Sequence, residues 1–321
     1  MSFPFNRVLV TGGAGFIGSH LTEALVAKGC RVTVLDNLTT GHMANLSTVK
    51  DRIEFVHGDI RDLGTLDRTT SGCEFIFHLA AVVSVPQTVE QPVDSAKVND
   101  MGTLHVFEAA RNSGAVGVVF ASSSAVYGDD PELPKREDML PKTLSPYAAQ
   151  KMTGEYYAQV YTNLFGIKST CLRFFNVYGP RQDPSSAYSG VISIFMAKTV
   201  SGTSPTIYGD GNQSRDFVFV GDVVRAILLA AASSAAAGGS VNIGSGRPVT
   251  VNNLWEMICR INGSTMPPLY APSRPGDIYA SVADIEKAKS QIGFSPETDF
   301  DRGLELTFQW YKKSVGSNAE V

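Results

Sequence analysis

Residues 8–18 read Val-Leu-Val-Thr-Gly-Gly-Ala-Gly-Phe-Ile-Gly, and this stretch decides the fold. Its first four residues have the apolar and β-branched character of a buried strand, and an apolar helical periodicity begins at Ile17. Gly12 permits a tight turn, Gly15 lets the backbone approach a pyrophosphate, and Gly18 lets the helix pack close to the sheet. Because a helix N-terminus attracts anions, the stretch predicts a strand, a glycine turn and a helix that together bind a dinucleotide.

The ends of the next predicted strands indicate which dinucleotide is bound. The run 31–35 leads into Asp36, whose carboxylate can accept hydrogen bonds from the adenosine ribose and would repel a 2′-phosphate. NAD is therefore favoured over NADP, although Asp is also common there as an ordinary turn residue. Asp59 could lie at the adenine edge, and the small residues Ala80 and Ala81 would let the chain pass beneath the cofactor. Taken alone, these last features are equally typical of packed strand ends.

Short β-branched runs alternate with amphipathic stretches through the first half of the chain. The runs and stretches lie at 7–10, 17–28, 31–35, 53–56, 75–77 and 116–121. This alternation predicts an α/β fold with a doubly wound parallel sheet of the Rossmann type. After Arg173, loops rich in Gly, Pro, Asp and Ser predict a smaller, mostly α/β substrate-binding lobe. We expect an NAD-binding domain at 1–175 and a second domain at 176–321, with segments near 214–244 (217–220 and 241–243) returning to the first.

The composition excludes several classes of protein. The 321 residues are 43% hydrophobic and 18% charged, as in a globular protein. A net charge of −4 offers no basic field for a nucleic acid. Cys30, Cys73, Cys171 and Cys259 are scattered, with no His at zinc-ligand spacing, so we expect a reducing compartment and no metal site. Because no signal peptide is evident and the longest apolar run, 226–232, is too short for a membrane span, we expect a cytoplasmic protein without membrane contact.

Three residues downstream have the pattern of a proton-transfer site. Tyr147 and Lys151 lie four apart in a predicted helix, 145–161, so they share a face, and Ser123 ends the fifth predicted strand. Lowering a phenol pKa from about 10 to about 7 needs roughly 4 kcal/mol, which one cation about 4 Å away supplies at an effective dielectric near 20. We therefore predict that Tyr147 is the base, that Lys151 lowers its pKa and holds the nicotinamide ribose, and that Ser123 orients the reacting oxygen.

At these residues the sequence resembles a known family. The shared motifs follow in order along nearly the whole chain: 11–18, Asp36-Asn37-Leu38, 58–62, Asn99 before Gly102-Thr103, 122–128, Ser145-Pro146-Tyr147 with Lys151, 173–180, 214–217 and 274–277. They resemble the extended short-chain dehydrogenase/reductase family, specifically its UDP-hexose (UDP-galactose and UDP-N-acetylglucosamine) 4-epimerase branch. The resemblance implies NAD as cofactor and a UDP-sugar as substrate.

The resemblance also implies a set of binding residues. The cofactor would be bound by Gly12, Gly15, Phe16, Ile17, Gly18, Asp36, Asn37, Asp59, Ile60, Leu79, Ala80, Ala81, Asn99, Tyr147 and Lys151. The UDP-sugar would be bound by Ser84, Ser123, Asn176, Gln182, Tyr208, Arg215, Arg274, Asp277 and Ser281. Within this set, Asn176, Arg215 and Arg274 would hold the diphosphate, Asp277 its ribose, and Tyr208 would stack on uracil.

The implied reaction is inversion at C4, by oxidation to a 4-keto sugar and re-reduction on the opposite face. Related dehydratases and decarboxylases resemble one another in carrying acidic residues after the strand-end hydroxyl, where this chain has Ser124 and Ala125. Ser281 stands where epimerases restricted to unacetylated hexoses have a bulky Tyr. We therefore expect UDP-GlcNAc and UDP-GalNAc as preferred substrates, with UDP-glucose and UDP-galactose secondary.

Two alternatives differ from this interpretation. One is a UDP-glucuronate (uronate) 4-epimerase, and the other is a non-catalytic NAD-binding sensor, which would be expected to lack Tyr147 or Lys151. The resemblance further implies a homodimer, in which helices at 92–112 and 145–160 pair across a four-helix interface.

Overall fold

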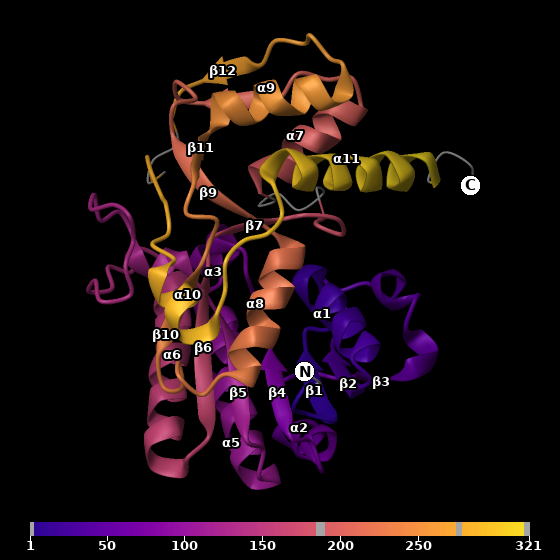
Figure 1. Cartoon of the computed structure of the whole chain (residues 1–321), viewed down its shortest axis with the longest axis vertical. Helices are drawn as coiled ribbons and strands as arrows, with labels where there is room; N and C mark the ends of the chain where they lie inside the picture. The colour runs from indigo at the N-terminus through magenta and orange to yellow at the C-terminus, as the bar shows by residue number, and fades with distance from the viewer. Residues whose placement is uncertain (1–2, 184–189, 274–277, 318–321) are drawn as a thin grey trace.

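The computed structural model describes residues 3–183, 190–273 and 278–317, with side chains to residue 313 in the last helix. A larger lobe is built on a seven-stranded sheet, and a smaller lobe lies above it in the view of Figure 1. The seven strands are β1 (Arg7–Thr11), β2 (Arg31–Asp36), β3 (Ile53–His57), β4 (Phe75–His78), β5 (Gly117–Ser123), β6 (Lys168–Phe174) and β10 (Ser240–Ile243).

The strand order positions a ligand site. The order is β10-β6-β5-β4-β1-β2-β3, and every neighbouring pair is parallel. The chain moves outward from β1 in one direction and from β4 in the other, so the order reverses between these two strands. In open parallel sheets, ligands bind beyond the carboxyl ends of the strands at such a reversal.

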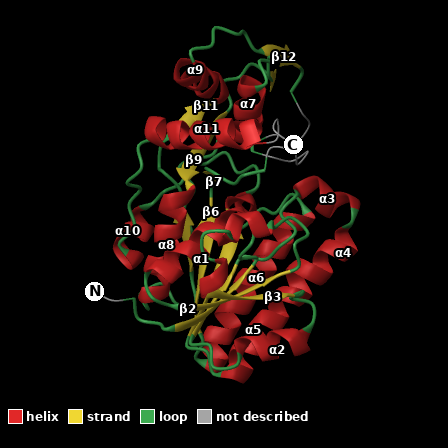
Figure 2. Ribbon diagram, turned by 90° about the vertical axis from the view of Figure 1, so that its right-hand side faces the viewer, coloured by secondary structure: helices red, strands yellow, loops and turns green. Residues whose placement is uncertain are grey.

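Helices cover both faces of this sheet (Figure 2). One apolar cluster packs α1 (Phe16–Ala27), α8 (Val220–Ala232) and α10 (Glu286–Ile292) on one face. A second cluster packs α2 (Leu63–Thr70), α5 (Thr103–Ser113) and α6 (Pro146–Phe165) on the other. Two short helices, α3 (Val85–Glu90) and α4 (Pro92–Ala96), precede α5. The strands are apolar on both sides because both faces are buried.

The smaller lobe has its own core. It contains a three-stranded sheet in the order β11-β9-β7 and a two-stranded sheet of β12 and β8. Its strands are β7 (Asn176–Tyr178), β8 (Thr206–Tyr208), β9 (Ser214–Phe219), β11 (Pro248–Thr250) and β12 (Leu269–Ala271), and its helices are α7 (Val191–Val200), α9 (Val251–Asn262) and α11 (Phe300–Ser317). Large side chains such as Phe195, Trp255 and Phe308 fill the space between them.

The first five predicted strands are confirmed, and each runs one or two residues further than expected. The helix predicted at 92–112 is interrupted by a π-helical segment, Lys97–Gly102, which places Asn99 to accept a hydrogen bond from the Val82 amide at 2.8 Å. Segment 241–243 joins the larger sheet as β10. Segment 217–220, expected to do the same, instead lies largely in β9, which pairs with β7 and β11. Among the described residues, no helix is both long and apolar enough to cross a bilayer.

Candidate active site

The glycine turn after β1 forms a close-packed cradle. Gly12 has a φ of +71°, and a Cβ there would lie 2.7 Å from the Ala80 nitrogen. A Cβ on Gly18 would overlap the Gly12 carbonyl oxygen. Helix α1, which includes Phe16 and Ile17, begins without any side-chain cap at Gly15. Because the first N–H groups of a helix need acceptors, this uncapped end fits the pyrophosphate of a dinucleotide.

Asp36 closes the cradle from the end of β2. Its two carboxylate oxygens accept hydrogen bonds from the Ala14 and Leu38 amides at 2.9 and 2.8 Å. Each oxygen keeps a second lone pair that a ribose hydroxyl can use. Asn37 donates a hydrogen bond to Asp59 at 2.9 Å, and Ile60 follows Asp59 in the chain. The Arg61 guanidinium is hydrogen-bonded to Asp59 and lowers the pKa of this carboxyl to about 2. The structure therefore brings the predicted adenosine residues to one edge.

The chain beneath the predicted cofactor site is fixed by hydrogen bonds to Thr11 and Asn99. The Leu79 amide donates to the Thr11 carbonyl at 3.1 Å, the Ala80 amide donates to the Thr11 hydroxyl at 3.3 Å, and Ala81 follows them. Asn99 is 3% exposed and donates to both the Val82 carbonyl and the Gln150 side chain. Since both amide hydrogens of Asn99 are used inside the protein, this residue holds the loop against α6.

A pocket of about 250 Å³ opens at the carboxyl end of β5. It is lined by five of the predicted residues: Ser123, Tyr147, Asn176, Arg215 and Ser281. These residues come from β5, α6, β7, β9 and the segment after residue 278, so both lobes contribute. Strand β9 is tied to that segment by buried Asp216, which accepts hydrogen bonds from the Ala283 amide at 3.0 Å and from Ser245 and Gly246. The pocket therefore depends on the junction of the two lobes.

The Tyr147 hydroxyl is the acid–base candidate in this pocket. Helix α6 begins at Pro146 with Ser145 as its side-chain cap, which places Tyr147 in the first turn. Burial raises the pKa of Tyr147, and the neighbouring Ser123 hydroxyl opposes that shift. Lys151 lies one turn later, is 4% exposed, and donates from Nζ to the Ala121 carbonyl at 2.7 Å.

The geometry corrects one part of the sequence argument. Lys151 Nζ lies 5.8 Å from the centroid of the Tyr147 ring and donates its hydrogen bond to the Ala121 carbonyl. Burial also lowers the pKa of Lys151 to about 8. The Tyr147 phenol is itself partly desolvated, so Lys151 alone does not bring its pKa to neutrality. Further positive charge is needed beside the phenol, and an oxidised nicotinamide bound there would provide it.

Other predicted substrate residues lie outside the lining of this pocket. Ser84 caps α3 by accepting from the Gln87 amide at 3.1 Å, and its neighbour Val85 lines the pocket instead. Gln182 donates to the Val177 carbonyl at 3.1 Å, and Tyr208 ends β8 in the smaller lobe. Arg274 and Asp277 lie outside the described residues.

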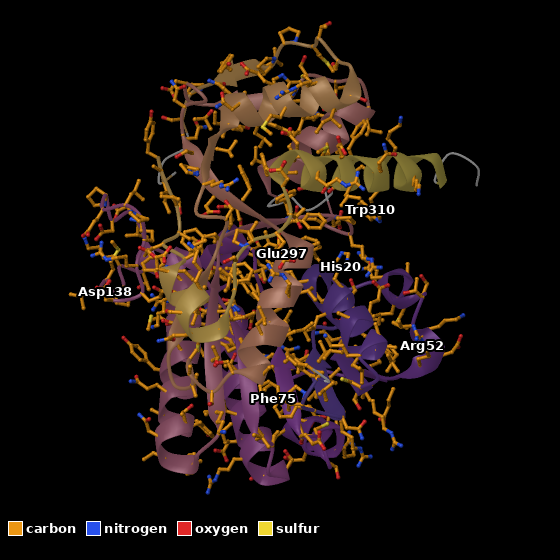
Figure 3. The ribbon with its side chains drawn as sticks, viewed as in Figure 1. His20, Arg52, Phe75, Asp138, Glu297 and Trp310 are labelled. Carbon is orange, nitrogen blue, oxygen red and sulfur yellow. The ribbon has the colours of Figure 1, made fainter. Side chains whose placement is uncertain are left out.

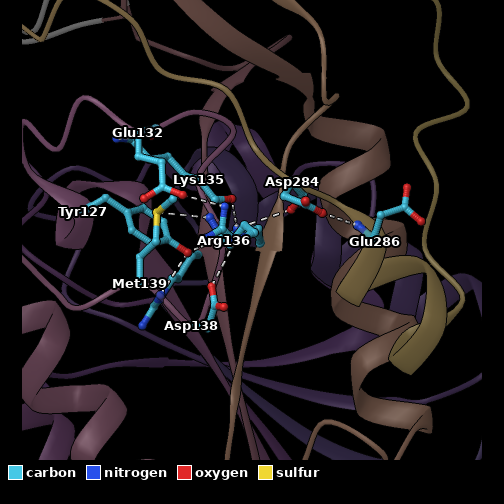
Figure 4. A network of polar contacts seen from close by, with 10 residues as sticks. Tyr127, Glu132, Lys135, Arg136, Asp138, Met139, Asp284 and Glu286 are labelled. Atoms are coloured by element: carbon cyan, nitrogen blue, oxygen red, sulfur yellow. Dashed lines mark hydrogen bonds and ion pairs between the residues drawn. The ribbon is translucent and has the colours of Figure 1, made fainter.

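Several residues that line the pocket were not predicted from the sequence. Lys135, Phe174, Phe175 and Ile278 line the pocket, and Lys135 is 1% exposed. Figure 4 shows the loop around Lys135 beside the segment of Asp284 and Glu286. The Lys135 amide donates to the Val282 carbonyl at 2.8 Å, and the Asp284 amide donates to the Lys135 carbonyl at 2.9 Å. These contacts join residues about 150 positions apart, and no local pattern in the sequence marks them.

A second junction joins α1 to the start of the smaller lobe. His20 lies between the lobes in Figure 3, and its Nε2 contacts the Pro180 carbonyl at 2.9 Å. Arg181 pairs with Glu23 at 2.7 Å. The cradle helix is thereby connected to the chain that follows Asn176 and Tyr178.

Comparisons with known proteins agree with this geometry. The model of the NAD dependent epimerase/dehydratase family matches residues 8–244. A UDP-glucose 4-epimerase of Mycolicibacterium smegmatis is 40% identical over 313 residues, which cover 95% of this chain and 98% of that protein. 

Two solved structures share the fold along nearly the whole chain. A UDP-N-acetylglucosamine 4-epimerase from Methanobrevibacter ruminantium, in complex with UDP-N-acetylmuramic acid, has a TM-score of 0.93 and 39% identity, covering 97% of this chain and 99% of that one. A Thermus thermophilus UDP-glucose 4-epimerase in complex with NAD has a TM-score of 0.87 and 40% identity, covering 95% and 99%. With the family match over residues 8–244, they show that this chain belongs to the NAD dependent epimerase/dehydratase family, whose cofactor fits the glycine cradle.

Proposed function

We propose that the chain is a UDP-sugar 4-epimerase that acts on UDP-GlcNAc and UDP-GalNAc, with UDP-glucose and UDP-galactose as secondary substrates. One observation carries the choice of reaction. Among the described residues that line the pocket, none is Asp, Glu or His. Elimination of water needs an acid or base beyond Tyr147, and Ser124 and Ala125 cannot supply one. A 4-keto hexose in this pocket, which has no carboxylate to lose, is therefore reduced again.

The side chains have distinct tasks in this reaction. Ser123 orients the 4-hydroxyl, and the Tyr147 phenolate takes its proton. In the second half of the reaction Tyr147 returns a proton to the same oxygen. Arg215 and Asn176, on neighbouring strands of the smaller sheet, hold the diphosphate so that the sugar can turn while the nucleotide stays in place.

NAD fits the residues that the larger lobe presents. We propose that residues 1–175 hold it, through the uncapped start of α1, the Asp36 carboxylate and Lys151, while 176–321 bind the nucleotide sugar. Bound there, NAD would supply a hydride acceptor and donor for C4 and a positive charge that favours the Tyr147 phenolate. Gly12 allows the turn to pack against the backbone at Ala80, and Gly18 allows α1 to pack against the turn, so the start of α1 is held at the cradle.

The function is tested by incubating purified protein with each UDP-sugar and separating the products by chromatography. Interconversion of UDP-GlcNAc and UDP-GalNAc without net consumption of NAD is expected. Conversion of UDP-glucuronate alone would instead support a uronate epimerase. No turnover of any UDP-sugar by NAD-loaded protein would support a sensor.

The state of Lys151 predicts a basic limit to turnover. Its pKa of about 8 lies below that of an ordinary lysine, so the ammonium is lost as the pH rises through about 8. Loss of this cation raises the pKa of the Tyr147 phenol, and kcat is expected to fall above about pH 8. A pH–rate profile measures this fall. Lys151→Arg is the control, because a guanidinium stays charged and the fall in kcat above about pH 8 should disappear. A wild-type profile flat to pH 10 would contradict the assignment.

Ser281 supports the preference for acetylated sugars. Its side chain lines the same pocket as Ser123 and Tyr147, and its amide is fixed to the Ser214 carbonyl at 3.2 Å. The Ser281→Tyr variant should reduce kcat/KM for UDP-GlcNAc at least about tenfold more than for UDP-glucose, because the ring would fill the space of an acetamido group. Ser281→Ala, which removes only the hydroxyl, should leave the ratio nearly unchanged. Equal losses of kcat/KM on both sugars would contradict a role for Ser281 in selecting acetylated sugars.

We also propose a homodimer formed by the outer faces of α4, the π-helical segment and α6. These faces expose apolar side chains, namely Val93 at 68%, Met101 at 48%, Tyr156 at 56%, Val160 at 44% and Leu164 at 71%. Apolar surface of this kind is typical of a protein interface. Sedimentation of the purified protein measures its mass directly, and a single monomeric species would exclude the dimer.

A further inference from the structure

A buried ion pair lies on the same face of α6 as the proposed catalytic residues. Glu155 follows Lys151 by four positions and Tyr147 by eight, so the three side chains form one column along the helix. Arg173 on β6 donates to Glu155 through Nε at 2.9 Å and through Nη2 at 2.7 Å. The side chains are 4% exposed for Arg173 and 6% for Glu155. This is a two-point clamp between α6 and the sheet.

The clamp connects to two sides of the substrate pocket. Ser122, next to Ser123, donates to Glu155 at 2.5 Å. On the other side, Arg173 donates to the Tyr127 oxygen at 2.9 Å, and the Tyr127 hydroxyl donates to Asn242 at 2.6 Å. Asn242 donates in turn to the Lys135 carbonyl at 2.8 Å, in the loop that Figure 4 shows around Tyr127 and Lys135. Strand β5, helix α6 and this loop therefore share one polar network.

Stability does not by itself account for such a pair. Removing two charges from water is costly, and replacing a buried ion pair by apolar side chains is often neutral or stabilising. The clamp does two things that apolar packing would not do. It fixes α6 by directional bonds to the strand that carries Ser123, and it cancels the charge of each partner beside Lys151.

We infer that Glu155 and Arg173 are positioning residues of the reaction, which hold Tyr147 and Lys151 in register with Ser123 while presenting no net charge to them. This inference rests on the proposed function. It assigns neither residue a contact with substrate or cofactor.

Three buried titratable groups near the column are neutral. Burial lowers the pKa of His78 to about 3, raises that of Cys171, and raises that of Tyr127 to about 12, so all three are uncharged at neutral pH. The remaining titratable or charged groups on described elements packed against α6, or close to the network, are Glu90, Asp94, Lys97, Asp100, His105, Glu108, Arg111, Lys135, Glu137 and Lys168, together with Tyr156, Tyr157 and Tyr161 on α6 itself. Asp94 and Lys97 pair with each other at the surface. Removing one partner of the ion pair would therefore leave the charge of the other, Glu155 or Arg173, as a new charge close to Lys151 and Tyr147.

Opposite charge changes test this inference. Glu155→Gln leaves the guanidinium uncompensated, which favours the Tyr147 phenolate and disfavours the Lys151 ammonium, so the pH–rate profile should move to lower pH. Arg173→Met leaves a carboxylate and should move the basic limb to higher pH. For Tyr147, eight residues or about 12 Å along the helix from Glu155, one charge corresponds to about one pH unit at an effective dielectric near 20, and Lys151, four residues away, should shift at least as far. The double variant Glu155→Met/Arg173→Met should return the profile to its original position.

A second readout does not depend on the substrate. The ionisation of Tyr147 is followed by tyrosinate absorbance, as the difference between each variant and the same variant carrying Tyr147→Phe. We expect the pKa of Tyr147 to shift in opposite directions in the two single variants and to return to its original value in the double variant, even if the assigned sugar is wrong. Shifts of the same sign, or none in folded protein, would overturn the inference.

Conservative variants test the positioning itself and remain usable if a single charge removal prevents folding. Glu155→Asp and Arg173→Lys keep both charges but change the reach of one partner. We expect kcat to fall at least about fivefold, with KM and the pH optimum unchanged. A full wild-type kcat in both conservative variants would also overturn the inference.

Discussion

A Tyr147→Phe variant is expected to keep its NAD and to lose roughly a hundred- to ten-thousand-fold in kcat, the range over which a positioned acid–base group acts. The reason lies in the composition of the pocket. Of the described lining residues, Tyr127 also has a phenol, but burial raises its pKa to about 12 and its oxygen is bonded to Arg173 and Asn242. Lys135 donates to the Asp130 and Glu132 carbonyls and is turned into its own loop. Neither can replace the Tyr147 hydroxyl.

The matched control for this variant is Tyr270→Phe. Tyr270 lies in β12 of the smaller lobe, is 58% exposed and is not among the residues that line the pocket. Its kcat should stay near the wild-type value. Single-turnover measurements on NAD-loaded protein separate a loss of chemistry from a loss of cofactor. If Tyr147→Phe retained more than about a tenth of the wild-type rate, another group would have to move the proton.

Features that depend on short stretches of sequence were predictable. The glycine turn lies within seven residues, and the backbone overlap at Gly18 explains why no larger residue fits there. Ser123 ends β5 because an apolar run stops there, and Tyr147 with Lys151 share a face because a helix repeats every 3.6 residues. These relations need no knowledge of distant contacts.

Features that depend on long-range packing were not predictable. Lys135 reaches the pocket only because its loop pairs with residues 282–284. The 5.8 Å between Lys151 Nζ and the Tyr147 ring follows from the bond of Lys151 to the Ala121 carbonyl, which the four-residue spacing does not reveal. Segment 217–220 has an apolar strand pattern that suits either lobe, and its pairing with β7 decides between them. In each case, tertiary contacts determine the outcome.

A Gly18→Ala variant is expected to bind NAD roughly ten- to a hundredfold more weakly and to lose activity in proportion at limiting cofactor. The added methyl would overlap the Gly12 carbonyl oxygen and lie 2.8 Å from the Gly13 Cα. Both neighbours are backbone, so relief requires helix α1 to move away from the glycine turn. Overpacking of this kind costs about 1–3 kcal/mol. The movement displaces the N–H groups at the start of α1 from the pyrophosphate, so the cost falls mainly on cofactor binding.

Gly64→Ala is the matched control, because Gly64 lies at the start of α2, where a Cβ would lie 3.4 Å from the Asp62 carboxylate, at ordinary contact distance. The same substitution there should leave NAD affinity unchanged and slightly raise the melting temperature, since alanine favours a helix. Cofactor content is measured by absorbance at 260 nm of the supernatant after denaturation, and affinity by titration of cofactor-free protein. If Gly18→Ala bound NAD as tightly as Gly64→Ala, the glycine turn would not be the pyrophosphate cradle. A loss confined to Gly18→Ala locates the cradle at the contact between α1 and β1.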